Sequence, residues 1–402
     1  MTFFEFSFFN WLYLFISCLI LFHWLYIIKL GLEFRKINLD FSNFLNKTGI
    51  TKQKSFPKVS VIFSARDEEL SIRRTLQSLS DQNYKNMEVI MINDRSKDKT
   101  ALIMEEFSKK YSHFKKIDIK ELPKSWLGKT HALYLGAKQA QGEYFLFTDA
   151  DVWFDPKAIE KALSFLIEKN LDHLTLTPDL KSKSALLSSL KLFFVVVFFL
   201  YSRPSKIKDN KSYMGVGAFN LIKKSVYQKI GGHKKLRLEV IDDVGLGRLV
   251  FLNRFKSYLA SGRDLLNIYW YNSSKEMFKG LEKNVFSIIN YSILKFILAN
   301  FYFFTVFYSP FIFIFFSSSV FLKICFSFNL FLMLAVFFNT AKELRYNPVV
   351  SLITPFSFIL LHFNFIYSVF KVLILQKIVW RDTSYSLKEI KTYLKDRDYR
   401  LE

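Results

Sequence analysis

Residues 143–154 read EYFLFTDADVWF, and this stretch decides how the middle of the chain is interpreted. An apolar run from Tyr144 to Phe147 is typical of a strand that is buried on both faces. Asp149 and Asp151 follow at once, and in an extended segment two such residues point to the same side. Paired carboxylates are the oxygen ligands that Mg2+ or Mn2+ prefers. The stretch therefore indicates a metal site at the end of a buried strand, or simply a turn that begins with acidic residues.

Strands alternate with helices between residue 58 and about residue 178. The segments expected to be strands are residues 59–65, 87–94, 115–122, 144–150 and 173–178. The helical stretches between them are residues 71–82, 99–111, 129–141 and 156–168. This alternation predicts an α/β fold whose mostly parallel sheet carries helices on both faces.

Acidic residues follow several of these strands. The first strand ends in SARDEE (residues 64–69), the second in NDRS (residues 93–96) and the fourth in TDAD (residues 148–151). Ligands of parallel α/β sheets bind at the carboxyl ends of the strands. Carboxylates gathered at one edge repel one another unless something positive lies among them. The pattern therefore favours a functional site over separate acidic turns.

The composition indicates a membrane protein with a large water-facing domain. Hydrophobic residues make up 51% of the 402 residues, yet there are 57 Lys and Arg against 35 Asp and Glu. Residues 3–30 are apolar for longer than the roughly 20 residues that a spanning helix needs, so we expect residues 1–30 to be a transmembrane anchor. A signal peptide is the alternative, but a basic leading region and a small-residue cleavage site are missing.

The basic residues predict the orientation of this anchor. Residues 31–57 read as a basic linker, which places the following domain on the cytoplasmic side of the cell (inner) membrane by the positive-inside rule. The net charge of +22 does not favour a nucleic-acid partner, because the basic residues adjoin membrane segments, where anionic headgroups are available. Cys18 and Cys325 both lie in apolar segments and predict no disulfide framework.

The C-terminal part is expected to be a membrane region of residues 285–375 followed by a basic tail, residues 376–402. Residues 296–338 are long enough for two spans, and residues 349–375 give another. Three spans would place the tail on the opposite side from the domain, whereas its basic residues favour the cytoplasm. The sequence leaves this conflict open.

Several motifs together resemble the family 2 glycosyltransferases, whose catalytic domain has the GT-A fold. In chain order they are VSVIFSARDEE (59–69), VIMINDRSKDKT (89–100), LPKSWLGKTHAL (122–133), FTDADVWF (147–154), YMGVGAFNLIKK (213–224), KIGGH (229–233) and IDDVGLGRLV (241–250). With the tail motif IVWRDTSYSL (378–387), LPKSWLGKTHAL looks like the integral-membrane branch that glycosylates lipids, near the hopanoid-associated, carotenoid-type and ceramide glucosyltransferases. The resemblance covers residues 58–284, the expected GT-A domain, and the tail.

The resemblance implies a role for each matching residue. Those that would contact the nucleotide sugar are Ala65, Asp67, Glu68, Asp94, Gly128, Lys129 and Asp149. Asp151 would be the direct metal ligand, and Asp149 would touch both metal and ribose. Asp243 occupies the position of the catalytic base, with Asp242 as the other possibility. Lys129 could also be only a surface lysine at the start of a helix, and His233 could line the acceptor site or be structural.

Residues 186–201 are a further apolar segment, interrupted by Lys191. As a helix the segment would span about 24 Å, which is less than the roughly 30 Å of the hydrocarbon core. A single crossing would also separate Asp149 from Asp243 by the membrane. We therefore expect an interfacial or re-entrant helix.

The implied function is that of a membrane-bound inverting glycosyltransferase. It would move a sugar from a nucleotide-diphosphate sugar to a hydroxyl of a lipid acceptor in one displacement, assisted by Mg2+ or Mn2+ and an Asp base. The Gln-x-x-Arg-Trp motif of processive polysaccharide synthases is absent, and residues 270–284 read WYNSSKEMFKGLEKN instead, which favours the transfer of one or few sugars.

Two other functions stay open. A nucleotidyltransferase on a related fold also uses metal-bound acids, but it would carry a glycine- and lysine-rich phosphate loop where SARDEE stands. A non-catalytic membrane scaffold is the second alternative, although a scaffold has no physical need for clustered acids.

Overall fold

The computed structural model describes residues 8–46, 57–380 and 383–399. The chain divides into two compact units, each built from several segments. The unit called here the sheet unit consists of Glu33–Lys181, Ser202–Trp270 and Tyr385–Glu402. The helical unit consists of Met1–Leu32, Ser182–Tyr201 and Tyr271–Ser384.

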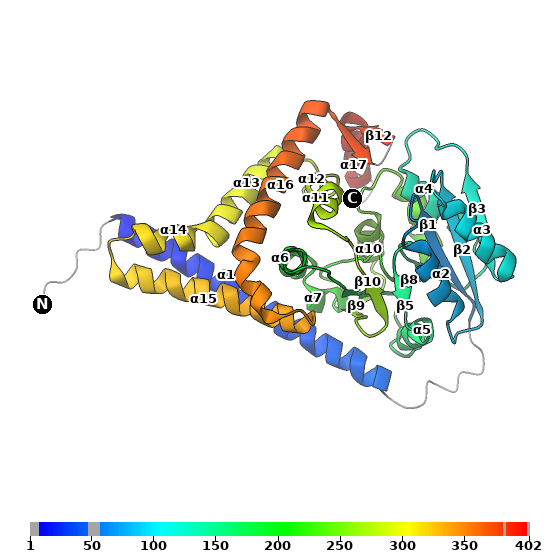
Figure 1. The fold of residues 1–402 in the computed structure, drawn as a ribbon, viewed down its shortest axis with the longest axis horizontal. Coiled ribbons are helices and arrows are strands. Elements are labelled where there is room, and N and C mark those ends of the chain that lie inside the picture. The colour runs from blue at the N-terminus through cyan, green and yellow to red at the C-terminus, as the bar shows by residue number, and fades with distance from the viewer. Residues whose placement is uncertain (1–7, 47–56, 381–382, 400–402) are drawn as a thin grey trace, which may run out of the picture. The chain divides into compact units, whose positions relative to one another are not determined.

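A seven-stranded sheet forms the centre of the sheet unit, in the order β3-β2-β1-β4-β8-β6-β9 (Figure 1). Its strands are β1 (Val59–Ala65), β2 (Met87–Asp94), β3 (Phe114–Ile119), β4 (Tyr144–Phe147), β6 (His173–Thr177), β8 (Asn220–Lys223) and β9 (Ser257–Ser261). Only β8 is antiparallel to its neighbours, β4 and β6, and the other neighbouring pairs in this sheet are parallel. A smaller sheet has the order β5-β10-β7 and consists of β5 (Trp153–Phe154), β10 (Leu266–Ile268) and β7 (Asp179–Leu180).

Helices cover both faces of the large sheet. The helices of this unit are α2 (Ile72–Ser80), α3 (Thr100–Lys110), α4 (Gly128–Gln139), α5 (Ala158–Glu168), α7 (Pro204–Lys208), α8 (Lys224–Lys229), α9 (Gly232–Lys235), α10 (Asp242–Leu252) and α17 (Leu387–Tyr399). Alternate residues of β1 point to opposite faces. Val61 and Phe63 share a core with α2, α3 and α5, whereas Ile62 packs with α4, α8 and α10. The predicted fold class, a mostly parallel α/β sheet covered on both faces, is confirmed.

Strand β4, expected at residues 144–150, is shorter in the structure. Strand β4 ends at Phe147, and the chain turns at Ala150 and Asp151. Thr148 donates its hydroxyl to the carbonyl of Ala218 at 2.8 Å, which ties this turn to the loop before β8. Asp149 and Asp151 therefore lie on a turn and not on an extended segment.

Helix α1 (Phe8–Asn46) is much longer than a membrane anchor requires. Phe34, Ile37 and Phe41 are buried at helical spacing, and the ring of Phe41 packs edge-on against Phe165 of α5 at 4.8 Å. Residues 31–46, expected to belong to a linker, are therefore helical, because this apolar stripe has a core to pack against. The rest of the expected linker, residues 47–56, lies outside the described residues.

The helical unit contains long apolar helices. Its elements are α6 (Ala185–Ser202), α11 (Ser274–Leu281), α12 (Val285–Ile288), α13 (Ile293–Phe303), the π-helix η1 (Phe304–Tyr308), α14 (Ser309–Phe316), α15 (Val320–Glu343), the 3-10 helix η2 (Pro348–Ile353) and α16 (Thr354–Leu375). Their shared core includes Trp24, Phe193, Phe307, Phe337 and Phe358. Between η2 and the tail helix lie α16 and two short strands, β11 (Lys377–Trp380) and β12 (Thr383–Ser386).

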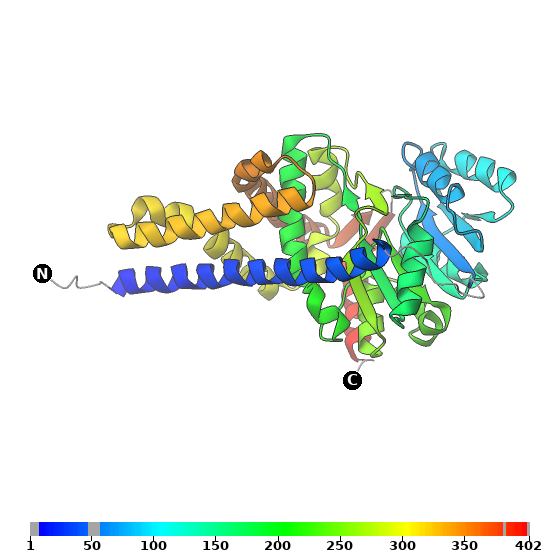
Figure 2. The same cartoon turned by 90° about the horizontal axis from the view of Figure 1, so that it is seen from below.

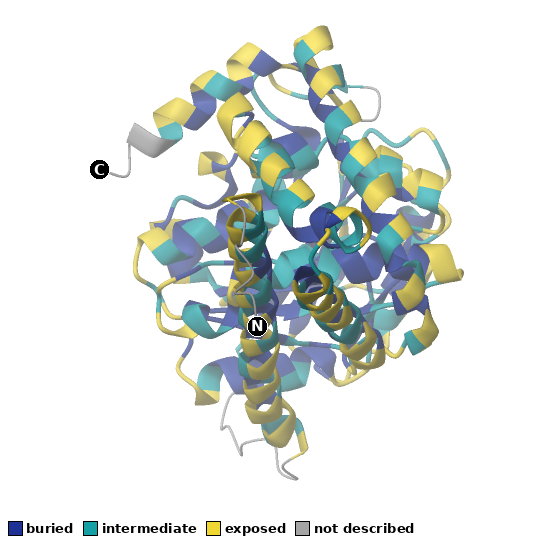
Figure 3. Ribbon diagram, turned by 90° about the vertical axis from the view of Figure 1, so that its left-hand side faces the viewer, coloured by how far each residue is buried: buried dark blue, intermediate teal, exposed yellow. Residues whose placement is uncertain are grey.

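Five helices are long and apolar enough to cross a membrane, by length and composition, among the residues that the structure describes. These segments are Phe8–Asn46, Ala185–Lys208, Ile293–Phe316, Val320–Glu343 and Pro348–Leu375. Many of their large side chains face outward, which Figure 3 shows as exposed helix surfaces. Examples are Phe15 and Phe22 of α1, Phe331 of α15 and Phe363 of α16. Exposed apolar surface of this extent marks contact with a membrane or a partner.

The long helices of the helical unit run in two different directions. The part of α1 within the helical unit lies beside α15, to which it is tied by the hydrogen bond from Asn329 to Ser17 at 2.8 Å. Helices α14 and α15 form a hairpin through the short connection at Ser318. Helix α16 runs across α1 and α15, as the two views in Figures 1 and 2 show.

Candidate active site

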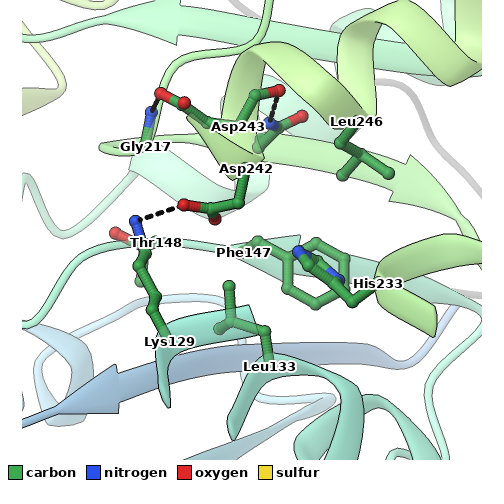
Figure 4. Close-up of a pocket in the computed structure, with 10 residues that line it drawn as sticks. Lys129, Leu133, Phe147, Thr148, Gly217, His233, Asp242, Asp243 and Leu246 are labelled. Carbon is green, nitrogen blue, oxygen red and sulfur yellow. Dashed lines mark hydrogen bonds and ion pairs between the residues drawn. The ribbon is translucent and has the colours of Figure 1, made fainter. Parts of the chain in front are cut away.

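Lys129 lies among several acids of the sheet unit. It is the second residue of α4, and its ammonium lies 2.8 Å from Asp149 and 3.3 Å from Asp242. Burial alone would lower the pKa of Lys129, but the carboxylates of Asp149, Asp242 and Asp243 outweigh burial and raise this pKa well above its ordinary value. The acid after β4 and the acid that begins α10 thus meet at one lysine. Figure 4 shows the pairing of Lys129 with Asp242. The alternative of a mere surface lysine does not fit this position.

Asp243 lies in the same pocket but contacts a different partner. Its Oδ2 accepts a hydrogen bond from the backbone N–H of Gly217 at 2.7 Å, and its Oδ1 accepts one from Val244 at 2.9 Å. Burial and the neighbouring carboxylate of Asp242 raise the pKa of Asp243 to about 6, although Lys129 opposes the shift. A carboxylate with such a pKa is suited to accept a proton near neutral pH.

The loop before β8 brings the two groups of acids together. A Cβ added at Gly217 would lie 2.5 Å from Oδ2 of Asp149, and one added at Gly215 would lie 1.7 Å from the carbonyl oxygen of Asp243. Both contacts are closer than real Cβ atoms show. At Gly215 the clash is with backbone, so the position requires glycine, whereas at Gly217 a side chain would displace the carboxylate of Asp149. Gly217 was not predicted as a site residue. The sequence does show two glycines close together in YMGVGAFN, which is part of one of the family motifs. A glycine has no side chain that would indicate a chemical role, so the pair was passed over.

Asp94 and Gly128 are neighbours in the structure. Asp94 ends β2 and is buried, and Arg95 donates to its Oδ1 at 2.8 Å. A Cβ added at Gly128 would lie 2.2 Å from Oδ2 of Asp94, so the start of α4 packs directly on this carboxylate. Asp94 therefore adjoins the turn that presents Lys129.

The predicted site residues at the end of β1 and just after it have different surroundings. Ala65 is buried at the end of the strand. Glu68 lies close enough to Asp151 for its charge to help raise the pKa of Asp151. The exposed Asp67 accepts a hydrogen bond from the backbone N–H of Lys97 at 2.7 Å, so in this structure it links the ends of β1 and β2. Asp67 is not one of the described residues that line the pocket around Lys129.

Asp149 and Asp151 alone do not complete the coordination of a divalent cation, so further oxygen atoms would have to come from a bound molecule or from water. Burial and then the carboxylates of Asp149 and Glu68 raise the pKa of Asp151 well above its ordinary value. Within residues 8–46, 57–380 and 383–399, no group of three or more His, Cys, Asp or Glu side chains is placed to hold a metal. The acids nevertheless fit a hard cation, because they supply oxygen ligands that repel one another. Diphosphate and water oxygens would complete its coordination.

His233 is a packed side chain of this pocket. It is 1% exposed, its ring lies 4.6 Å from that of Phe147, and its Nδ1 pairs with the hydroxyl of Tyr227 at 3.0 Å. Burial, together with Lys129, lowers the pKa of His233 to about 3. The imidazole is therefore neutral at physiological pH, and its structural role is evident.

These observations define a class of protein: an α/β domain with a charged ligand site at the carboxyl ends of its parallel strands, where such sheets bind nucleotides. Residues 60–231 match the sequence profile of Glycosyl transferase family 2. The chain therefore carries a family 2 glycosyltransferase domain, which agrees with the GT-A type of fold expected from its motifs.

Curated relatives carry related descriptions. The chain is 27% identical to 4,4'-diaponeurosporenoate glycosyltransferase of Staphylococcus haemolyticus over 233 residues, which is 56% of this chain and 60% of the relative. It is 33% identical to poly-beta-1,6-N-acetyl-D-glucosamine synthase of Staphylococcus epidermidis over 43% of this chain and 41% of the relative. It is 39% identical to the probable glycosyltransferase YdaM of Bacillus subtilis over 24% of each chain. The chain thus spans between 24% and 60% of these relatives' lengths.

Solved structures are similar at a more distant level. Mannosyltransferase PcManGT from Pyrobaculum calidifontis, solved in complex with GDP-Man and Mn2+, is 15% identical with a TM-score of 0.45, covering 93% of this chain and 97% of that chain. Residues 1–349 of Staphylococcus aureus TarS in complex with UDP are 15% identical with a TM-score of 0.38, covering 82% of this chain and 96% of that chain.

Proposed function

We propose that this protein transfers a sugar from a nucleotide-diphosphate sugar to a hydroxyl group of a membrane lipid. One observation carries the proposal: Lys129 pairs with both Asp149 and Asp242, and Asp243 lies in the same pocket. A donor diphosphate and an acceptor hydroxyl could thus be held on the two sides of one lysine. The family 2 domain and the descriptions of the relatives support the same reaction class.

In this mechanism the chain's own residues hold the donor and move one proton. Lys129 leaves its present carboxylate partners to contact the leaving diphosphate, whose negative charge increases as the bond to the sugar breaks. The acceptor oxygen attacks the anomeric carbon from the opposite face, which inverts that centre. The carboxylate of Asp243 takes the hydroxyl proton, and the nucleoside diphosphate departs with the bonding electrons.

Asp151 and Asp149 would hold a Mg2+ or Mn2+ ion with the diphosphate. Bound there, such an ion supplies Lewis-acid neutralisation of the leaving phosphates. The description of PcManGT names Mn2+, which supports metal use in this fold without choosing between the two metals here.

A lipid acceptor is supported by the exposed apolar helices and by one relative. The relative described as a 4,4'-diaponeurosporenoate glycosyltransferase acts, by its name, on a carotenoid acid. Another relative is named a polysaccharide synthase, and this favours a growing glycan as the second candidate acceptor. The absence of Gln-x-x-Arg-Trp from residues 270–284 favours the lipid.

The membrane placement proposed here has the sheet unit on the cytoplasmic side. Helix α6 is preceded and followed by segments of the sheet unit, and we therefore propose that it stays on one side of the bilayer. The tail from Tyr385 also belongs to the sheet unit, so the chain crosses an even number of times between Trp270 and Tyr385. Three candidate spans lie in that interval, and one of them must stay on one side. We assign this role to α16, because it runs across α1 and α15 (Figure 1).

This placement answers the conflict that the sequence leaves open. If the segment Ile293–Phe316, which contains α13, η1 and α14, crosses together with α15, the basic tail and the sheet unit share the cytoplasmic side, as the positive-inside rule requires. Helices α6 and α16 would then lie at the interface, where a lipid hydroxyl can be presented to the site.

The experiment compares polar lipids from cells that express the wild type, Asp243→Asn or Asp209→Asn, by mass spectrometry. Asp209 is an exposed acid outside the pocket around Lys129 and serves as the matched control. We expect a lipid heavier by one sugar with the wild type and Asp209→Asn, and none with Asp243→Asn. Equal lipid profiles in all three strains would contradict the proposal.

The second product separates the alternatives. Release of a nucleoside diphosphate supports sugar transfer, whereas release of pyrophosphate would identify a nucleotidyltransferase. Wild-type protein that binds no nucleotide in the presence of Mn2+ or Mg2+ would instead leave the scaffold alternative.

A further inference from the structure

The C-terminal tail contacts the turn that presents Lys129. Tyr385 is 8% exposed, and its hydroxyl accepts a hydrogen bond from the backbone N–H of Gly128 at 3.3 Å. Gly128 is the first residue of α4, where the backbone N–H groups have no partner within the helix. One turn earlier, Ser125 donates its hydroxyl to Glu389 of α17 at 2.5 Å. The tail thus anchors the segment just before Lys129 at two points.

The same tail anchors the loop that leads to the acid pair. Tyr393 donates its hydroxyl to the carbonyl of Lys235 at 2.5 Å, and Arg397 forms an ion pair with Glu239. Leu387, Ile390 and Leu394 on the same helix are buried. Glu239 lies three residues before Asp242, so α17 contacts both of the segments whose charged side chains meet in the pocket.

These two segments are also joined directly. The backbone N–H of Leu127 donates to the carbonyl of Arg237 at 2.8 Å, and Thr130 donates its hydroxyl to the same carbonyl at 2.9 Å. These hydrogen bonds connect the loop of residues 235–239 to the start of α4, and the tail contacts both segments. A shift of Tyr385 would move the backbone of Gly128, and with it the neighbouring Lys129.

We propose that Tyr385 is a positioning residue for Lys129, and that the tail helix α17 acts as a strap that fixes the donor half of the site. The proposal rests on the function proposed above, because Lys129 has a ligand to contact only if the protein binds a nucleotide. Tyr385 touches no reacting atom in this scheme and acts through the backbone of Gly128.

The test measures nucleotide binding by purified full-length protein in detergent. The probes are UDP, GDP, CDP, ADP and dTDP, each with Mn2+, titrated by calorimetry to give both a dissociation constant and a binding stoichiometry. Tyr385→Phe removes one hydroxyl and keeps the ring. Tyr258→Phe is the matched control, because Tyr258 is 7% exposed in the same unit and donates its hydroxyl to Asp40 at 3.2 Å, among residues that do not line the pocket around Lys129.

We expect Tyr385→Phe to weaken binding of the preferred nucleotide by about three- to tenfold, the effect of losing one net hydrogen bond. Its stoichiometry should stay equal to that of the wild type, and its thermal unfolding midpoint should fall no further than that of Tyr258→Phe. A merely structural role would lower the stoichiometry or the midpoint and leave the dissociation constant of the folded fraction unchanged.

The outcomes separate the two proposals. If the wild type binds a nucleotide and Tyr385→Phe binds it equally well, the positioning role is wrong and the proposed function stands. If Tyr258→Phe weakens binding as much as Tyr385→Phe, the effect is a general loss of packing and the positioning role is again wrong. If the wild type binds none of the five nucleotides, the proposed function fails and the role of Tyr385 fails with it.

Discussion

At the residue scale, the site depends on which charges lie next to one another. Residues such as Asp149 and Asp243 are far apart in sequence, and their meeting at Lys129 follows from the fold. A lysine placed between carboxylates is a group that can change partners when a diphosphate arrives, because phosphate oxygens compete with carboxylates for the ammonium. The residues to alter first are therefore those that set the charge balance of this pocket.

The pH dependence distinguishes the two candidate bases. If Asp243 is the base, kcat/KM rises with pH through an apparent pKa of about 6, because the carboxyl must lose its proton before it can accept one. Asp242→Asn removes a neighbouring negative charge that raises this pKa, so the acidic limb should move to lower pH. Asp243→Asn should reduce the rate by about 10²–10⁴-fold.

The measurement is the release of nucleoside diphosphate by purified protein supplied with host lipid extract, from pH 4.5 to 8.5. The assignment would be reversed if Asp242→Asn lost activity while Asp243→Asn kept it.

A substitution at Gly217 tests whether nucleotide binding depends on the position of the Asp149 carboxylate, a predicted metal ligand. Gly217→Ala should weaken Mn2+-dependent nucleotide binding by at least about tenfold, because the new Cβ would lie 2.5 Å from Oδ2 of Asp149 and displace that carboxylate. Gly31→Ala is the matched control, since a Cβ there meets nothing within 4 Å. Nucleotide affinity measured for both variants decides the matter, and equal affinities would show that Asp149 has room to move.

At the scale of elements, the periodic segments of the sheet unit follow from the sequence. Strands β1 and β2 coincide with the predicted residues, and α2, α3, α4 and α5 end within about two residues of their predicted limits. Strands β1 and β2 are near-continuous apolar runs and are buried along almost their whole length, as expected for strands covered on both faces. The antiparallel strand β8 and the small sheet were not predicted, because two- to four-residue strands carry too little pattern to be recognised.

The extension of α1 gives a prediction at this scale. Phe41→Ala should lower the free energy of unfolding by about 3–5 kcal/mol, because the buried ring fills a space against Phe165 that a methyl group leaves empty. Leu39→Ala, on the exposed side of the same helix, should change it by less than about 0.5 kcal/mol. Urea unfolding followed by tryptophan fluorescence in detergent compares the two. Equal losses would mean that α1 does not pack on the sheet unit through Phe41.

At the scale of the whole molecule, the decisive question is how many helices cross the bilayer. Five helices qualify by length, but both ends of α6 and the tail after α16 belong to the sheet unit. In the proposed placement, length and hydropathy alone overcount the crossings, since an apolar helix can also be buried in protein or lie at the interface.

Cysteine labelling tests the proposed crossings. In a Cys18→Ala, Cys325→Ala background, single cysteines are introduced as Ser318→Cys, Asn347→Cys or Lys388→Cys and exposed to a membrane-impermeant maleimide. We expect Ser318→Cys to react in intact cells, and the other two only after permeabilisation, because in the proposed placement Ile293–Phe316 and α15 cross and α16 does not.

Each other topology gives a different pattern. Labelling of Asn347→Cys but not Ser318→Cys in intact cells would mean that α15 and α16 cross. Labelling of both would mean that α15 is the helix that stays on one side. Labelling of Lys388→Cys would place the tail outside and contradict its membership of the sheet unit.

The sequence by itself determined the α/β class, the apolar ends and the acids at the strand ends, because these depend on local periodicity and on residues adjacent in the chain. Only the tertiary structure decided that Lys129 lies between Asp149 and Asp242, that Gly217 passes between the two groups of acids, and that Tyr385 contacts Gly128. Each of these contacts joins segments that are far apart in the chain. No local pattern of residues specifies such a contact, because it exists only once the sheet has brought the segments to one edge.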